Sequence, residues 1–350
     1  MSFEYVLAIE TSCDDTSVAI VRQDGYVVEC LAANQDLVHQ PFGGVVPEIA
    51  SRNHTLQILP LVEKVLEKSE FTIDKIDGLA VTSRPGLIGS LLVGVVTAKT
   101  LALIHDRPLI GVNHLEAHLL APFLYDDEFS KPQDLKFPYL ALAISGGHTQ
   151  LYLVHDFGQY EVLGRTVDDA AGEAFDKFAK RLGLSFPGGV QVDRLAKDGD
   201  KNKYALPRTM VHEDSYNFSF SGLKSAATRL VDSLSDSERL SERAHLCASF
   251  QEAVVESLMY KLNKAAQELS ISRVVLTGGV SANSRLREVS EAWAKKNKIT
   301  LFVPPIRYCT DNAAMVGFAG VQRLIKGESS DQNLSASASS LPSDFKEASR

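Results

Sequence analysis

Hydrophobic residues near the start of the chain fall into short runs separated by polar turns. Three of these runs are β-rich and are expected to form sequential strands joined by tight turns, at residues 6–9, 17–21 and 26–31. A helical pattern follows over residues 47–68, and Pro60 is expected to kink or divide it. A buried strand, a helix and another strand are then expected at residues 78–82, 87–104 and 109–112. This alternation of strand and helix predicts parallel crossover units.

The same order of elements returns after a polar, proline-containing stretch at residues 125–138. Further strands are expected at residues 139–144, 151–155 and 160–163, followed by helices and by a buried strand at 273–277. The pattern predicts a duplicated α/β protein, with an N-terminal domain over residues 1–135 and a C-terminal domain over 136–326. Residues 328–340 are rich in Ser, Asp and Asn without apolar periodicity, so residues 327–350 are expected to form a mobile tail.

The composition narrows the classes of partner. The 350 residues are enough for about two domains. The 36 basic and 44 acidic side chains give a formal net charge of −8, which argues against binding to nucleic acid or an anionic membrane through the overall field. The most apolar run, residues 86–98, is shorter than the ~20 residues that span a bilayer. With no leader pattern and four scattered cysteines, the sequence predicts a reduced, cytoplasmic compartment and no membrane contact.

Three turns have the chemistry of phosphate or ribose contact, at residues 9–17, 144–149 and 276–283. They combine hydroxyls, backbone N–H groups and glycines, and Gly146 and Gly147 let the backbone approach a ligand closely. Any one of them is more often a plain connection. Three at equivalent places in a duplicated frame resemble the actin, hexokinase and Hsp70 ATPase superfamily, in which two domains close on a nucleotide around a central cleft. No GxxxxGK[ST] loop is present, which disfavours the P-loop class.

A metal-ligand pattern begins the predicted helix after the strand at 109–112. His114 and His118 are four residues apart and therefore lie on one helix face. Asp311, in a turn before the last long helix, is the best candidate for a third ligand, although Asp in such a place also serves as an N-cap. Cys309 could instead bind a soft metal, but a buried role as a small apolar residue is the commoner one. Two His and one carboxylate suit non-haem iron and catalytic zinc, and both stay open.

A zincin protease is disfavoured, because its HExxH motif needs Glu directly after the first His and the chain has Leu115 there. Taken together, the motifs closely resemble the TsaD family, the bacterial tRNA N6-adenosine threonylcarbamoyltransferases once misnamed O-sialoglycoprotein endopeptidases. They occur in one unbroken order: IETSCDDT at 9–16, GGVVPE at 43–48, HLEAH at 114–118, SGGHTQ at 145–150, DDAAGEAFDK at 168–177, FSFSGLK at 218–224 and CTDN at 309–312.

The resemblance implies a transfer of the threonylcarbamoyl group from threonylcarbamoyl-adenylate to N6 of adenosine 37, in tRNAs that read codons beginning with A. It implies one Fe2+ per subunit on His114, His118 and Asp311, with Zn2+ as a substitute in vitro, and ATP or ADP as a further ligand. The implied substrate contacts are Ala143, Ile144, Ser145, Gly146, Gly147, Asp176, Gly189, Asp193 and Asn283. Archaeal and eukaryotic relatives carry Tyr at Ala143. No catalytic base is assigned; Glu10, Glu116 and metal-bound hydroxide all stay open.

A tRNA substrate must be held by an acidic protein, which requires a local basic surface. Candidates are Lys197, Lys201, Lys203 and Arg208, extended by Lys224 and Arg229, although such a cluster is more often a solvated face. The resemblance also implies partners: a TsaB-like paralogue, a TsaE-like ATPase and a functional link to a TsaC-like adenylate synthase. Two rival functions are a small-molecule kinase of the same fold, which needs no histidine pair, and a non-catalytic nucleotide-binding scaffold, which usually lacks both that pair and the Gly-rich loops.

Overall fold

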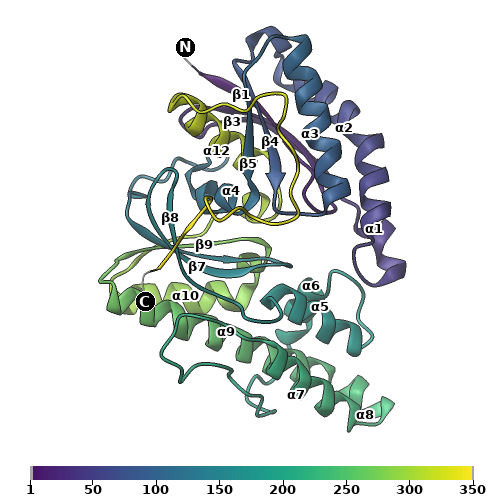
Figure 1. Ribbon diagram of the computed structural model, residues 1–350. Helices are drawn as coiled ribbons and strands as arrows, with labels where there is room; N and C mark the ends of the chain where they lie inside the picture. The colour runs from purple at the N-terminus through teal and green to yellow at the C-terminus, as the bar shows by residue number, and fades with distance from the viewer. Residues whose placement is uncertain (1–2, 349–350) are drawn as a thin grey trace. The chain divides into compact units, whose positions relative to one another are not determined.

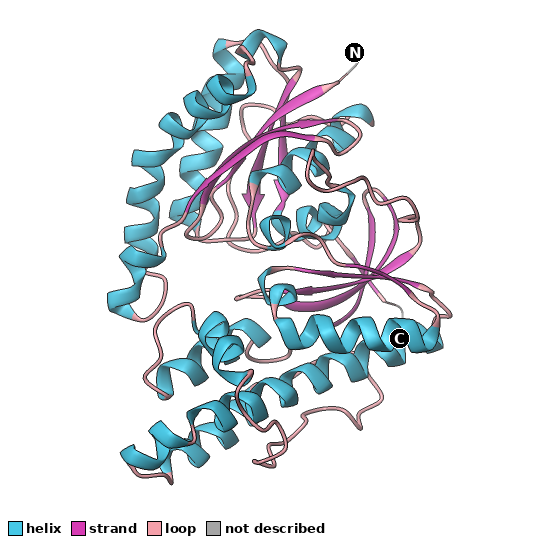
Figure 2. Ribbon diagram, turned by 180° about the vertical axis from the view of Figure 1, so that it is seen from behind, coloured by secondary structure: helices cyan, strands magenta, loops and turns pink. Residues whose placement is uncertain are grey.

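The structure, a computed structural model, describes residues 3–348. The chain forms two compact units, each with its own β-sheet. The first unit comprises residues up to 135, 156–160 and 304–346; the second comprises residues 136–155, 161–303 and those from 347 on. Figures 1 and 2 show the strands of each unit with helices packed against them.

The first unit contains a five-stranded sheet in the order β3-β2-β1-β4-β5. Its strands are β1 Tyr5–Glu10, β2 Thr16–Arg22, β3 Val27–Ala33, β4 Gly78–Arg84 and β5 Leu109–Asn113. β1 to β3 are antiparallel neighbours, whereas β4 and β5 run parallel to β1. The helices are α1 Asp36–His39, α2 Pro47–Ser69, α3 Ile88–Ile104, α4 His114–Leu120, α11 Ile306–Cys309 and α12 Ala313–Ile325, with 3-10 turns at Gln40–Phe42, Ile73–Lys75 and Ala121–Phe123.

The two faces of this sheet are covered by different helices. Leu7 and Ile9 of β1 belong to the apolar core that α2 and α3 complete. Because side chains alternate along a strand, Ala8 points to the opposite face, where an ideal Cβ on Gly317 of α12 would lie 3.1 Å from the Ala8 Cβ. Pro60 lies inside α2, which continues as one helix to Ser69, so of the two predicted outcomes, a kink or a division, the division does not occur.

The second unit contains a six-stranded sheet in the order β10-β9-β6-β7-β8-β11. Its strands are β6 Tyr139–Ile144, β7 Thr149–Asp156, β8 Gln159–Arg165, β9 Arg273–Thr277, β10 Thr300–Phe302 and β11 Lys346–Glu347. The helices are α5 Ala171–Arg181, α6 Gly188–Ala196, α7 Ser221–Asp232, α8 Asp236–Ser241, α9 Arg243–Glu268 and α10 Ser284–Asn297, with a 3-10 turn at Gly279–Ala282. The long α9 supplies much of the apolar core, including Phe250 and Leu258, and packs beside α10. Each unit thus opens with three antiparallel strands and continues with parallel ones.

The end of the chain differs from the predicted arrangement. The sequence placed residues up to 326 in the second domain, whereas the structure groups residues 304–346 with the first unit because α12 packs on β1, β2 and β4. Residues 328–346, called the C-terminal strap below, lie where a mobile tail was expected. The strap is tied down: the Ser330 N–H donates to the Leu109 carbonyl over 2.7 Å, and Leu334 packs against the first unit's core. Within residues 3–348, no helix has both the length and the apolar character to cross a membrane.

Candidate functional site

The three predicted metal ligands come together in the first unit. β5 ends at Asn113, and α4 begins with His114, so the two histidines lie one turn apart with ring centroids separated by 4.6 Å. Asp311 lies between α11 and α12, and its Oδ1 is 3.1 Å from His118 Nε2 and 3.4 Å from His114 Nε2. One ligand atom from each residue falls within 4.8 Å of the others. The alternative N-cap role at α12 belongs to Asn312, whose Oδ1 accepts from the Met315 N–H.

A buried carboxylate fixes the first histidine from behind. Glu10, at the end of β1, is fully buried and accepts hydrogen bonds from the Ser12 N–H and the Thr82 hydroxyl. Its Oε2 lies 3.2 Å from His114 Nδ1. With Nδ1 donating to Glu10, the Nε2 lone pair of His114 faces the side of Asp311, which is how a carboxylate commonly orients a metal-binding histidine. The contact of Glu10 with His114 was not predictable from the sequence, in which Glu10 stood out only as a candidate base.

Charge in the group is balanced locally. Burial alone raises the pKa of Glu10 and of Asp311, but the neighbouring His114 outweighs this and holds both pKa values below their usual range. Burial alone lowers the pKa of His114, yet the carboxylates of Asp311 and Glu10 raise it well above the usual value. The side chains of His114 and His118 are 5% and 1% exposed, whereas Asp311 is 26% exposed. Two nearly buried imidazoles and one partly open carboxylate fit a divalent transition metal with positions left for a substrate.

The other candidates near this group are engaged elsewhere. Glu116 Oε1 accepts from the Tyr160 hydroxyl over 2.9 Å, and its Oε2 lies 3.6 Å from Arg323 Nη1. Cys309 is buried and its thiol donates to the Pro304 carbonyl over 3.1 Å, as expected for a small core residue. These contacts favour structural roles for both residues.

The predicted substrate loops lie in the second unit. Ala143 and Ile144 end β6, and Thr277 ends the parallel neighbour β9, so the loops that follow leave the same edge of the sheet. The loop after β6 is closed by a 2.8 Å hydrogen bond from the Ser145 N–H to the His148 carbonyl. The space beside its two glycines is open, because a Cβ added at Gly146 or Gly147 would meet nothing within 4 Å.

The remaining predicted contacts form two groups on α5, α6 and α10. Asp176 Oδ1 accepts from the Gly188 N–H over 2.8 Å, next to Gly189, where an added Cβ would meet only Phe175 at 3.8 Å. Asp193 Oδ1 accepts from the Ser284 hydroxyl over 2.8 Å.

The neighbouring Asn283 caps α10 through its Oδ1 and donates from Nδ2 to Gln251 Oε1 over 2.7 Å.

The expected basic surface is largely neutralised. Lys201 pairs with Glu252 at 2.9 Å, Lys203 with Glu242 at 2.5 Å and Arg208 with Glu256 at 2.6 Å. Lys224 pairs with Asp169. Contact of tRNA with this cluster stays a prediction, and any such contact must compete with these ion pairs.

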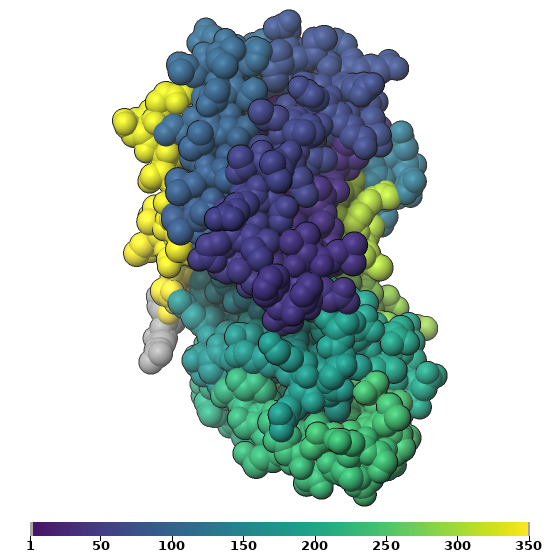
Figure 3. Space-filling view, turned by 90° about the vertical axis from the view of Figure 1, so that its right-hand side faces the viewer, coloured from purple at the N-terminus to yellow at the C-terminus, as the bar shows by residue number. Residues whose placement is uncertain are grey.

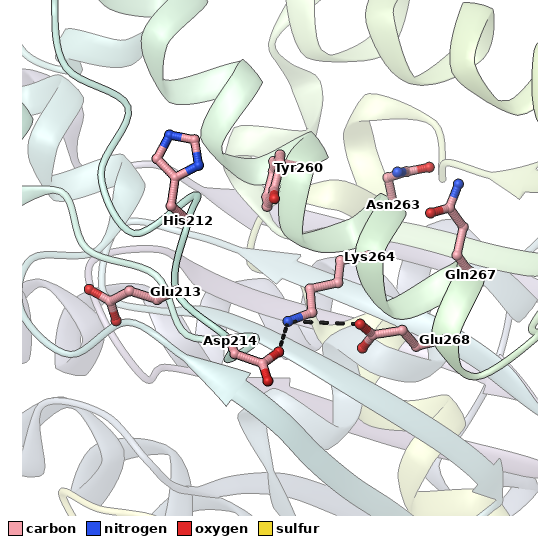
Figure 4. A pocket seen from close by; sticks show the side chains of 8 residues that line it. All are labelled: His212, Glu213, Asp214, Tyr260, Asn263, Lys264, Gln267 and Glu268. Atoms are coloured by element: carbon pink, nitrogen blue, oxygen red, sulfur yellow. Dashed lines mark hydrogen bonds and ion pairs between the residues drawn. The ribbon is translucent and has the colours of Figure 1, made fainter.

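A surface pocket of about 310 Å³ lies elsewhere in the second unit, beside α9 (Figure 4). Its polar lining includes Asp214 and Glu268, both of which contact Lys264. None of the predicted site residues lines it.

Comparison with solved structures defines the class of protein first. HypF from T. kodakarensis aligns with a TM-score of 0.59 at 13% identity, over 93% of this chain and 48% of that chain. Component A of the (R)-2-hydroxyglutaryl-CoA dehydratase from Acidaminococcus fermentans aligns with a TM-score of 0.54 at 14% identity, over 92% and 99%. These likenesses confirm the duplicated actin, hexokinase and Hsp70-type ATPase fold, to which this chain adds a His/His/Asp group.

Comparison with known sequences then gives the family. The family model for TsaD, tRNA N6-adenosine threonylcarbamoyltransferase, matches residues 26–318. A protein of that name from Bdellovibrio bacteriovorus is 55% identical over 344 residues, which cover 98% of this chain and 99% of the relative. Another from Thermosipho africanus is 49% identical over 332 residues, covering 95% and 98%. The chain therefore belongs to the TsaD family of tRNA N6-adenosine threonylcarbamoyltransferases.

Proposed function

We propose that this protein transfers a threonylcarbamoyl group from threonylcarbamoyl-adenylate to N6 of adenosine 37 in tRNAs that read codons beginning with A. The products are N6-threonylcarbamoyladenosine (t6A) in tRNA and AMP. The observation that carries the proposal is the grouping of the buried His114 and His118 with the partly exposed Asp311 in a chain of this family. A kinase or a passive scaffold of the same fold has no use for such a group.

The reaction needs positioning more than activation. The substrate is a mixed anhydride, so the bond between the carbamoyl carbon and the phosphate oxygen is already weak. The new bond joins that carbon to N6, AMP leaves, and N6 loses one proton. The backbone N–H groups of the loop residues Gly146 and Gly147 suit the phosphate, and the carboxylates of Asp176 and Asp193 suit ribose hydroxyls. The same loop suits bound ATP or ADP.

We assign Fe2+ to the His/His/Asp group, with Zn2+ as a substitute in vitro. When bound, the ion supplies a Lewis acid for the acyl oxygen or an anchor for the threonyl carboxylate. The chain's own part is to hold His114 with Nε2 available, through Glu10, and to keep Asp311 ionised between the two histidines. Glu10 is enclosed by the donors of Ser12 and Thr82, so we assign it positioning and not proton abstraction.

The proposed tRNA substrate places two demands on this chain, access to N6 and binding of a polyanion. Adenosine 37 lies in a single-stranded loop, so N6 is reached without unpairing a duplex. A net charge of −8 and paired lysines predict weak tRNA binding by this chain alone. A tRNA substrate places the proposed reaction in the cytoplasm.

An apolar face supports a protein partner. On α3, Leu92 and Val96 are 46% and 56% exposed at a spacing of four, so they form a stripe along the helix. On the adjacent α2, Leu56 and Leu59 are 72% and 54% exposed. The two helices belong to the surface coloured purple to blue in Figure 3. Several exposed apolar residues on two packed helices are typical of a protein interface.

We assign this helix face to the TsaB-like paralogue, and leave the TsaE-like ATPase and the TsaC-like adenylate synthase as functional links. The double variant Leu92→Lys and Val96→Lys should abolish co-elution with a purified TsaB-like protein. A matched control is Leu240→Lys, since Leu240 is a 65% exposed apolar residue on α8 of the second unit. Unchanged co-elution of the double variant would refute the assignment.

Nucleoside mass spectrometry tests the proposed reaction in cells. Depletion of this protein should lower t6A in tRNA, and wild-type protein, but not a His114→Ala and His118→Ala variant, should restore it. Unchanged t6A in depleted cells without a second copy of the protein would overturn the proposal. Phosphate transfer from ATP to a sugar by the isolated chain would favour the kinase.

A further inference from the structure

The C-terminal strap runs along the first unit toward the start of the metal-binding helix. The backbone of Ser330 pairs with Leu109 of the edge strand β5. The Ser330 Oγ also accepts from the Gly111 N–H of that strand over 3.0 Å. Leu334 then packs over β5, so closely that a Cβ on Gly111 would lie 2.6 Å from a Leu334 methyl. The Ser337 N–H donates to the Ser83 carbonyl over 2.9 Å. These contacts lead the strap to residues 340–344 beside Asn113.

Asp344 makes a nearly buried polar contact near the end of the strap. Its side chain is 7% exposed and forms a two-pronged ion pair with Arg84, with 2.8 Å between Arg84 Nε and Asp344 Oδ2. The same Oδ2 accepts from Asn113 Nδ2 over 2.8 Å, and the Ser340 hydroxyl lies 3.0 Å from that nitrogen. The amide nitrogen of Asn113 is therefore held by two residues of the strap.

These contacts decide which way the Asn113 side chain points. An ionised carboxylate only accepts hydrogen bonds, so Asp344 selects the NH2 end of the amide. The carbonyl end is then turned to α4, where Oδ1 accepts from the N–H groups of Leu115 at 2.8 Å and Glu116 at 3.4 Å. Asn113 is 1% exposed, so water cannot readily take over either end. The capped first turn begins with His114.

We propose that Asp344 is a positioning residue for the metal centre, acting through the side-chain amide of Asn113 on the first turn of α4. The strap thereby ties the end of the chain to the placement of His114. The inference rests on the metal-binding part of the proposed function. Asp344 would then support Asn113, which caps the helix that carries His114, while Glu10 contacts His114 directly.

A Co2+ titration of the full-length, metal-free protein, followed by visible absorption, tests the inference. Asp344→Ala should weaken Co2+ binding on the order of threefold to tenfold, less than the loss typical for a direct partner of a ligand. Asp344→Asn keeps the shape and one acceptor, so it should fall between Asp344→Ala and wild type. The control is Asp331→Ala, since Asp331 is an exposed strap residue whose carboxylate accepts hydrogen bonds from the nearby Asn333. It should bind Co2+ as wild type does.

A double-mutant cycle separates this route from general stabilisation. In an Asn113→Ala background, Asp344→Ala should have no further effect on Co2+ affinity, because the connecting amide is gone. Hydrogen exchange of the Leu115 and Glu116 amides should be faster in metal-free Asp344→Ala than in wild type. Wild-type Co2+ affinity in Asp344→Ala, or an undiminished effect in the Asn113→Ala background, would overturn the inference while leaving the proposed function intact. Failure of the wild-type protein to bind Co2+ would instead refute the metal site and the inference together.

Discussion

Glu10→Gln is the sharpest perturbation of the metal centre, because it changes one oxygen for an NH2 group without changing shape. Glu10 accepts from the Ser12 N–H through Oε1, while Oε2 faces the Thr82 hydroxyl and His114 Nδ1. If the Gln oxygen stays with Ser12, its NH2 group donates to Nδ1, and the proton of His114 moves to Nε2. That tautomer has no lone pair for a metal.

Metal binding would therefore require either the flipped amide, which sets a buried NH2 group against the Ser12 N–H, or donation from Nδ1 to the Ser12 hydroxyl 3.2 Å away, which leaves the NH2 group facing the Nδ1 proton. An unsatisfied buried donor costs about 1–3 kcal/mol, which corresponds to a loss of affinity of roughly 5- to 150-fold. A Co2+ titration should show this loss. Glu116→Gln is the matched control, because its amide oxygen can still accept from Tyr160. Affinity of Glu10→Gln within about twofold of wild type would refute the tautomer argument.

Three further predictions concern other parts of the molecule. Gly278→Ala should destabilise the protein by about 2 kcal/mol in urea unfolding, since φ is +85° and the new Cβ would lie 2.5 Å from the Ile144 carbonyl oxygen; a loss below about 0.5 kcal/mol would contradict this. Gly146→Ala, whose Cβ meets nothing within 4 Å, should leave stability unchanged but weaken adenylate binding measured by calorimetry, and unchanged binding would remove that loop from the site. Asp126→Asn should cost about 1–2 kcal/mol at pH 7. Burial raises the pKa of Asp126, but Tyr308 and Arg307 lower it below the usual 3.8. The difference in unfolding free energy between Asp126→Asn and wild type should therefore be full above about pH 4 and vanish as the pH falls further. A pH-independent difference would count against the ion pair.

The grouping of His114, His118 and Asp311 was predictable because part of its pattern is local. The spacing of His114 and His118 fixes a shared helix face, and Asp311 stands in a turn where a carboxylate is available. Glu10 was visible only as an acidic residue at a strand end. Its role depends on β1 and β5 both being neighbours of β4, which brings residues 104 positions apart into contact and leaves no periodic trace in the sequence.

The end of the chain shows the opposite case. Residues 328–346 are polar and lack periodicity, which is typical of a tail, yet single residues such as Leu334 and Asp344 anchor them to β4, β5 and Asn113. One apolar side chain and one carboxylate in a Ser-rich stretch are too few to register in a composition argument. In the same way, the position of α12 in the sequence predicts that it belongs to the second half, yet it packs on the first unit's sheet. The close contact of Gly317 with Ala8 of β1 depends on small residues, which give no signal in the sequence.

The most direct test of the account is reconstitution with purified components. Wild-type protein, a TsaB-like and a TsaE-like partner, threonylcarbamoyl-adenylate and an unmodified tRNA with adenosine 37 should yield t6A, measured by nucleoside mass spectrometry, together with AMP. The His114→Ala and His118→Ala variant, folded by circular dichroism, should yield none. Formation of t6A at the wild-type rate by this metal-free variant, or no t6A from the wild-type mixture, would contradict the account.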